Sequence, residues 1–120
     1  MAGIEKGSFD SPDETRTPEK MRLEAVKLGE TTAGRMTIQP GWKWSESIKP
    51  IVGTDKCEAR HVGTLISGTL HVVHGDGTEY DLVAGDAYVI EPGHDAWVVG
   101  NEPVVGYEFD QKTVQTYARA

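Results

Sequence analysis

The chain has 120 residues and a net charge of −7, from 12 basic and 19 acidic side chains. This length predicts a single domain with one core. Hydrophobic residues make up 38% of the chain and charged residues 26%, which favours a packed globule over a disordered chain. No apolar run approaches the roughly 20 residues that span a bilayer. The first residues lack the apolar core of a secretion signal, so we expect a cytoplasmic protein.

The charge is unevenly distributed along the chain. Residues 61–120 contain nine acidic and two basic side chains, whereas residues 1–60 are neutral. A surface of this kind repels a phosphate backbone and an anionic membrane. We therefore expect no nucleic-acid partner and no membrane partner. Cys57 is the only cysteine of the sequence, so the chain cannot form an internal disulfide.

Residues 1–20 differ in composition from the rest of the chain. They are polar, include Pro12 and Pro18, and show almost no apolar spacing. This composition predicts a flexible polar N-terminal arm over residues 1–20, followed by one folded domain over residues 21–120.

From residue 21 onward, short runs rich in β-branched and aromatic residues alternate with turn signals. The pair Asp76-Gly77 between two apolar runs is a strong hairpin signal. The pattern predicts an all-β sandwich or barrel, with a helical turn only at residues 111–119. The nine expected strands cover residues 22–28, 34–39, 42–48, 57–67, 69–74, 79–83, 87–90, 96–99 and 104–109.

Two segments in this pattern resemble sequence motifs of the cupin family of small jelly-roll β-barrels. Residues 65–72 read Leu-Ile-Ser-Gly-Thr-Leu-His-Val, like the end of the family's first motif, and residues 84–94 resemble the start of its second. Residues 40–45 and 92–97 are similar to segments of a bacterial subgroup of short, single-domain cupins. The resemblance covers residues 36–110 and implies a cupin jelly-roll β-barrel. Because this fold hosts many unrelated activities, it does not by itself imply a particular reaction.

The resemblance also locates the family's metal-ligand positions, and this chain departs from each of them. Counting back from Gly68, His61 stands where the first motif has Glu, while Cys57 and Asp55 stand where it has two His residues. In the second motif the His position falls on Ala96, and His94 lies two residues earlier. Residues two apart in a strand share a face, so His94 is a candidate replacement for that ligand.

Cys57, His61 and His94, with Asp55 or water as a fourth ligand, would form a mixed nitrogen and sulfur site. Such a set suits zinc or iron better than magnesium or calcium. On one straight strand, Cys57 and His61 would be about 13 Å apart, so a bend or bulge between them is required. The alternative is a buried apolar cysteine and a hydrogen-bonded histidine without a metal.

Aromatic residues are the remaining candidates for a site. Tyr88 and Tyr107 are candidate catalytic proton donors, and Trp44, Trp97 and Glu91 are candidate residues of a substrate pocket at the barrel mouth. The alternative for the aromatic residues is ordinary core packing, and for Glu91 a solvated turn.

The resemblance implies a small metalloprotein that acts as an enzyme on a small organic molecule, by dioxygenase, decarboxylase, isomerase or lyase chemistry. One alternative is a non-catalytic module that binds a small molecule or senses redox state through Cys57. Another is a metal-free cupin enzyme. Because cupins commonly pair through strands, we also expect a homodimer, with residues 22–28 as a candidate contact.

Overall fold

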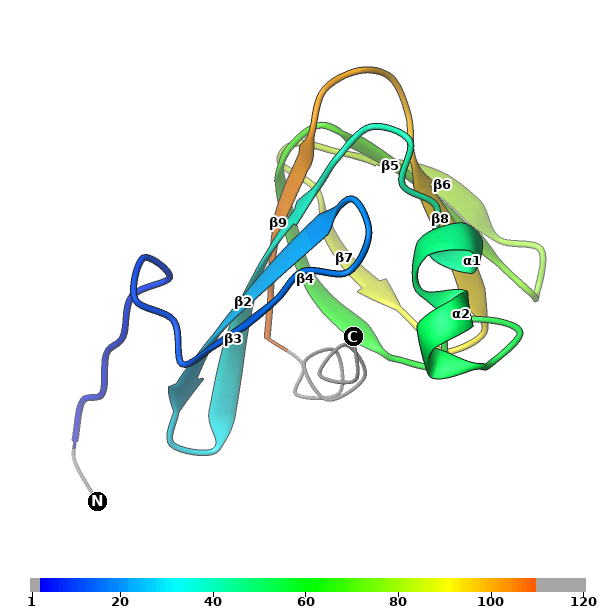
Figure 1. The fold of residues 1–120 in the computed structure, drawn as a ribbon. Coiled ribbons are helices and arrows are strands. Elements are labelled where there is room, and N and C mark those ends of the chain that lie inside the picture. Colours follow the sequence, from blue (N-terminus) through cyan, green and yellow to red (C-terminus); the bar gives the residue numbers. More distant parts are fainter. Residues whose placement is uncertain (1–2, 110–120) are drawn as a thin grey trace.

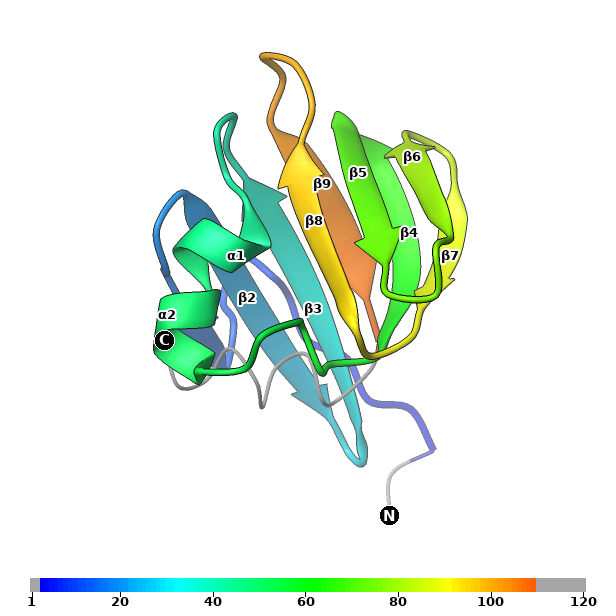
Figure 2. The same cartoon turned by 90° about the vertical axis from the view of Figure 1, so that its right-hand side faces the viewer.

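The computed structural model describes residues 3–109, which form two antiparallel sheets around a common interior (Figure 1). The larger sheet has the order β1-β2-β3-β9-β4-β7, and the smaller sheet has the order β6-β5-β8. Figure 2 shows the smaller sheet lying over the β9, β4 and β7 part of the larger one. The expected all-β barrel of two antiparallel sheets is therefore confirmed.

The strand bounds follow most of the expected runs. The larger sheet consists of β1 (Glu14–Arg16), β2 (Met21–Leu28), β3 (Thr31–Ile38), β9 (Val104–Glu108), β4 (His61–Ser67) and β7 (Ala87–Ile90). The smaller sheet consists of β6 (Glu79–Val83), β5 (Thr69–His74) and β8 (His94–Val98). The helical turn expected at residues 111–119 lies outside the described residues.

The core follows from the alternation of side chains along each strand. Leu65 on β4 is 1% exposed, and its neighbour Ile66 is 54% exposed, because successive side chains of a strand point to opposite faces. Leu23 on β2, Ile38 on β3 and Val104 on β9 are buried in the same core cluster. The barrel interior is therefore packed by one face of each sheet.

The expected strand over residues 42–48 is wrong, and so is the expectation that only residues 111–119 hold a turn of helix. This segment forms α1 (Trp44–Ser47), and α2 (Lys49–Val52) follows it. Trp44, Ser47 and Ile48 are buried, a spacing of three and four residues that is typical of a helix face. Pro50 does not end a strand but lies in the first turn of α2, where a missing N–H costs no hydrogen bond.

The segment around these helices runs along the free edge of β8. At one end, the Val98 N–H donates to the Trp42 carbonyl and Lys43 pairs with Trp97. At the other end, Cys57 pairs with His94. Cys57 is thus an isolated bridge on the smaller sheet rather than the start of β4, which begins at His61. The expected strand over residues 57–67 is too long by its first four residues.

Part of the N-terminal segment packs on the outside of the larger sheet. β1 pairs with residues Leu23–Ala25 of β2, and the Phe9 ring lies 5.3 Å from that of Tyr107. Arg35 ion-pairs with the buried Glu24 on the same outer face. Within the described residues, no helix is long and apolar enough to cross a membrane.

We predict that Leu65→Ala destabilises the fold by about 3 kcal/mol, because it removes buried methyl groups and leaves a cavity in the core. The matched control is Ile66→Ala on the opposite face of the same strand, for which we expect a much smaller change. Chemical denaturation of both variants measures the free energies of unfolding. Equal losses in the two variants would contradict this assignment of the two faces.

Candidate functional site

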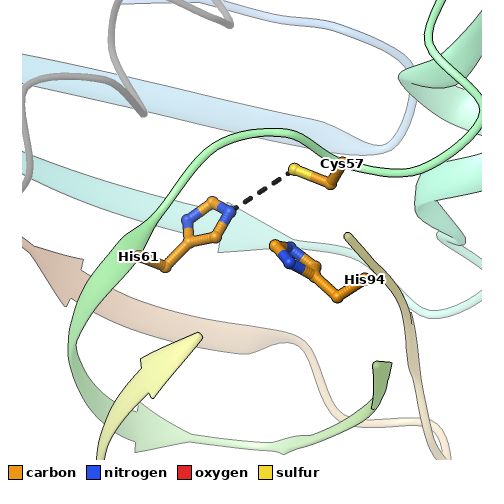
Figure 3. Close-up of side chains that lie close together, drawn as sticks. All are labelled: Cys57, His61 and His94. Carbon is orange, nitrogen blue, oxygen red and sulfur yellow. Dashed lines mark hydrogen bonds between the residues drawn. The ribbon is translucent and has the colours of Figure 1, made fainter. Parts of the chain in front are cut away.

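Three side chains with metal-binding atoms meet in the barrel interior. The candidate ligand atoms of Cys57, His61 and His94 all lie within 4.8 Å of one another, and the three residues are buried. Figure 3 shows the two imidazole rings side by side, with the Cys57 sulfur next to His61. The ring centroids of His61 and His94 are 5.0 Å apart in an edge-on arrangement.

Backbone pairing places Cys57 beside His94. The Cys57 N–H donates to the His94 carbonyl at 2.8 Å, and the Gly93 N–H donates to the Cys57 carbonyl at 2.7 Å. Directly paired residues of antiparallel segments project their side chains to the same face, here the barrel interior. Cys57 and His94 therefore come from the smaller sheet and its edge.

His61 reaches the same point from the larger sheet. Residues 58–60 carry the chain from the edge of the smaller sheet to the first residue of β4. The Cys57 Sγ and His61 Nε2 atoms are consequently 3.6 Å apart, although a straight strand would separate the two residues far more. The bend that the four-residue spacing of Cys57 and His61 requires is therefore the passage of the chain from the smaller sheet to the larger one.

Both histidines have one ring nitrogen engaged away from the cluster. His61 Nδ1 donates to Glu108 Oε1 at 2.7 Å, and His94 Nδ1 donates to the Glu91 carbonyl at 2.8 Å. These bonds fix the ring orientation and leave Nε2 of each ring for the cluster. Metal-binding histidines are held by the same kind of partner, a carboxylate or a carbonyl.

Glu108 is itself held by a third strand. The Tyr88 hydroxyl donates to Glu108 Oε2 at 2.6 Å, so one buried carboxylate joins β7, β9 and β4. Gly63 on β4 lies opposite both Tyr88 and Glu108. A Cβ atom at Gly63 would collide with the Tyr107 carbonyl oxygen and would lie 2.8 Å from Glu108 Cγ. The glycine thus allows the close approach of β9 to β4 and leaves room for the Glu108 side chain.

The buried charges of the site influence one another. Burial disfavours the Cys57 thiolate, but the hydrogen bonds with His61 and His94 outweigh burial and lower the pKa of Cys57 to about 6. Burial also opposes charge on His61, yet the Glu108 carboxylate and the Cys57 contact raise the pKa of His61. Burial and the Glu108 carboxylate raise the pKa of Tyr88, which keeps its hydroxyl protonated as a donor. The metal-free site therefore favours a thiolate beside an imidazolium.

The donor set fits a transition metal. A tetrahedral zinc ion with bonds of about 2.0 Å to nitrogen and 2.3 Å to sulfur holds its ligand atoms roughly 3.5 Å apart. The Cys57–His61 separation of 3.6 Å already matches this value, and the 4.8 Å limit of the cluster needs only small side-chain shifts. Three protein ligands would leave a coordination position for another molecule.

Asp55, the expected fourth ligand, is not brought to this cluster. Its side chain is exposed and its carboxylate ion-pairs with Lys49 at 2.9 Å, on the loop that precedes Cys57. Tyr107 and Trp97 face away from the interior, because Glu108 and Ala96 beside them point inward. The Tyr107 ring contacts Phe9, and the Trp97 ring contacts His71.

Trp44 lines a small cavity beside the cluster, together with His61 and His94. A wider cavity of about 670 Å³ opens between β6 and β7 and is lined by Tyr88 and Glu91. Glu91 also ion-pairs with Arg60 at 2.9 Å. Ile90 lines both cavities, so its side chain stands between the wider cavity and the small one beside the cluster.

Glu108, which accepts from His61, and Trp42, which lines the small cavity, also belong to this site, although the sequence did not single them out. Glu108 is one of nine acidic residues in the second half of the chain, most of which are solvated. Its position in the strand pattern is the one indication in the sequence: Glu108 lies two residues after Gly106 and four after Val104, so the three share the inward face of the strand. An acid on the inward face of a strand needs a buried partner.

No known family model matches this chain, and no curated protein matches it in sequence. Solved structures do resemble it. A structural-genomics protein of unknown function from Rhizobium leguminosarum is 19% identical with a TM-score of 0.63, and the match covers 91% of this chain and 98% of that one. KdgF from Halomonas sp. is 18% identical with a TM-score of 0.56, covering 81% of this chain and 86% of that one.

A third similar structure is of a protein whose fold is known. An uncharacterized conserved protein with a double-stranded beta-helix domain from Klebsiella pneumoniae is 20% identical with a TM-score of 0.59. The match covers 89% of this chain and 84% of that one. At these identities the likeness concerns the fold alone.

We predict that the Cys57 thiol of the metal-free protein ionises near pH 6, well below the ordinary thiol pKa of about 8.5. The ultraviolet absorbance of the thiolate, followed against pH, measures this ionisation. His61→Asn removes a hydrogen-bond partner that stabilises the thiolate, so we expect a higher Cys57 pKa in that variant. Cys57→Ser is the control, in which the absorbance change disappears. An ordinary thiol pKa in the native chain would contradict this account.

Proposed function

We propose that this chain, which has the cupin fold, binds a divalent transition metal through Cys57, His61 and His94 and acts on a small organic molecule at that position. The observation that carries the proposal is the buried cluster itself. Its two imidazoles have their Nδ1 atoms engaged and their Nε2 atoms left for a metal. Zinc and iron suit this donor set best. When bound, such an ion supplies a Lewis acid for an oxygen atom of the organic molecule.

The residues around the cluster support a site for a small molecule. The 670 Å³ cavity between β6 and β7 lies within the size range of ligand pockets. Its inner wall includes Tyr88, whose hydroxyl is committed to Glu108, so the tyrosine positions the carboxylate rather than facing a ligand as a free donor. Glu108 in turn orients the His61 ring. We propose positioning roles for both residues.

A redox-sensing role for Cys57 is the weaker alternative. Reactive sensor cysteines are exposed to their oxidant, whereas Cys57 is 0% exposed. The lowered pKa of the Cys57 thiol is also what a metal-binding thiolate needs, since the thiolate is the ligand form. The same burial that disfavours oxidation therefore suits a metal ligand.

We predict that the purified chain binds an equimolar amount of zinc, and that Cys57→Ser, His61→Ala or His94→Ala each weakens zinc binding by at least about 100-fold. The matched control is His71→Ala, because His71 lies on β5 outside the cluster and contacts Asp81. Chelator competition measures the affinities and elemental analysis measures the stoichiometry. With cobalt(II) in place of zinc, a sulfur-to-metal absorption band should be absent in Cys57→Ser. A native chain that binds neither metal would refute the proposal.

We also predict that Glu108→Gln weakens zinc binding by about 10–100-fold, the usual effect of losing a carboxylate that orients a histidine ligand. The glutamine keeps the side-chain shape but loses the charge that holds the His61 N–H. Glu102→Gln, an exposed neighbour in sequence, is the control. The same chelator competition compares the variants. An unchanged affinity in Glu108→Gln would show that Glu108 has no role at the metal.

A further inference from the structure

The cavity beside the cluster is small and largely apolar. Its volume is about 30 Å³, where a single water molecule needs roughly 10–15 Å³. It therefore admits a group of two or three heavy atoms. Its lining residues are Met21, Met36, Ile38, Trp42, Trp44, His61, Leu70, Ile90, His94, Ala96 and Glu108.

Two tryptophans of this lining carry buried N–H groups that find no acceptor in the described part of the chain. Within residues 3–109, the Nε1 atoms of Trp42 and Trp44 have no hydrogen-bond partner, although the side chains are only 4% and 1% exposed. A buried donor without an acceptor carries a desolvation cost. Buried indoles usually find an acceptor for this reason. Because both tryptophans line the same cavity, an acceptor bound there is the partner that these two donors lack.

The backbone directs both indoles inward. Trp42 and Lys43 pair with Val98 and Trp97 along the edge of the smaller sheet, and Lys43 lies outside, 5.0 Å from the Trp97 ring. Trp42 thus precedes an outward-facing residue, and Trp44 follows it as the first residue of α1. Both indoles belong to the buried core cluster.

The other polar side chains of the lining are already engaged. The two carboxylate oxygens of Glu108 accept from His61 and Tyr88. The Nδ1 atoms of His61 and His94 donate to Glu108 and to the Glu91 carbonyl, and their Nε2 atoms are taken by the proposed metal. The indole N–H groups are therefore the polar groups that the lining offers to a ligand. A ligand with N–H or O–H donors would find no acceptor for them in the cavity. An acceptor-only group of two oxygens is the best complement.

We propose that this cavity binds the carboxylate head of a small organic acid, with the indole N–H groups of Trp42 and Trp44 as its donors. The inference deepens the proposed function and rests on it, because a dication at the cluster offsets the negative charges of the Cys57 thiolate and Glu108. Without that ion, the His61 imidazolium offsets only one of these two negative charges, so the site keeps a net negative charge that repels an anion. The carboxylate thereby defines the class of molecule that the site takes.

The test uses the zinc-loaded, nitrogen-15-labelled full chain and sodium formate as the carboxylate probe. The chain has three tryptophans, so its NMR spectrum has three indole N–H signals, which Trp→Phe variants assign. We expect formate to shift the Trp42 and Trp44 signals in one saturable, millimolar transition, since so small a ligand binds weakly. The Trp97 signal outside the barrel should not move.

Formamide is the matched neutral probe, because it has the shape of formate but brings N–H donors. We expect it to bind at least about tenfold more weakly than formate, the effect of roughly one unsatisfied hydrogen bond. Trp42→Phe and Trp44→Phe should each weaken formate binding about tenfold, and Trp97→Phe should leave it unchanged. The titration of the unmodified chain remains decisive if a variant fails to fold.

The outcomes separate this inference from the proposed function. Zinc content is measured on the same sample, so a chain that holds no zinc fails the proposed function before formate is added. A chain that holds zinc but shows no formate-dependent shift of Trp42 and Trp44 overturns the carboxylate site alone. Formamide binding as tightly as formate overturns it as well. Weaker formate binding after zinc removal supports the stated link between the two.

Discussion

The pair of backbone hydrogen bonds between Cys57 and the Gly93–His94 segment is the constraint on which the site depends. It fastens the end of the helical connection to the edge of the smaller sheet. The following three residues then cross to β4 in the larger sheet, so two residues only four apart in sequence approach from opposite sheets. Without this bridge, Cys57 would have no fixed position relative to His94, and the three ligand atoms would not meet.

The second determinant is a single buried carboxylate. Glu108 accepts from His61 on β4 and from Tyr88 on β7, and Gly63 between them makes room for its side chain. An isolated buried carboxylate is costly, and these contacts offset that cost. The same arrangement fixes the His61 ring, so the stability of the barrel and the geometry of the cluster depend on shared contacts. The barrel thereby supplies a rigid support for the site.

The two cavities divide the surroundings of the cluster by chemistry. The wider one, between β6 and β7, is lined by several acidic side chains, including Glu79, Asp81 and Asp86. The small one is apolar except for indole donors and side chains that are already engaged. A ligand that uses both would need an acceptor at one end and no large negative charge at the other. This difference in charge between the two cavities restricts the ligands that could occupy both at once.

The sequence by itself determined the strand pattern, the barrel class and the identity of three candidate ligands, because period-two burial and short motifs are local properties. The sequence also led to errors, since the tryptophan-rich segment at residues 42–48 suggested a strand and Asp55 suggested a ligand. Helix α1 forms there because the segment docks on β8, and Asp55 lies outside because its loop ends before the bridge at Cys57. Only the tertiary structure brought Glu108 and Trp42 to the site. Their roles depend on pairings between residues distant in sequence, and no local pattern encodes those pairings.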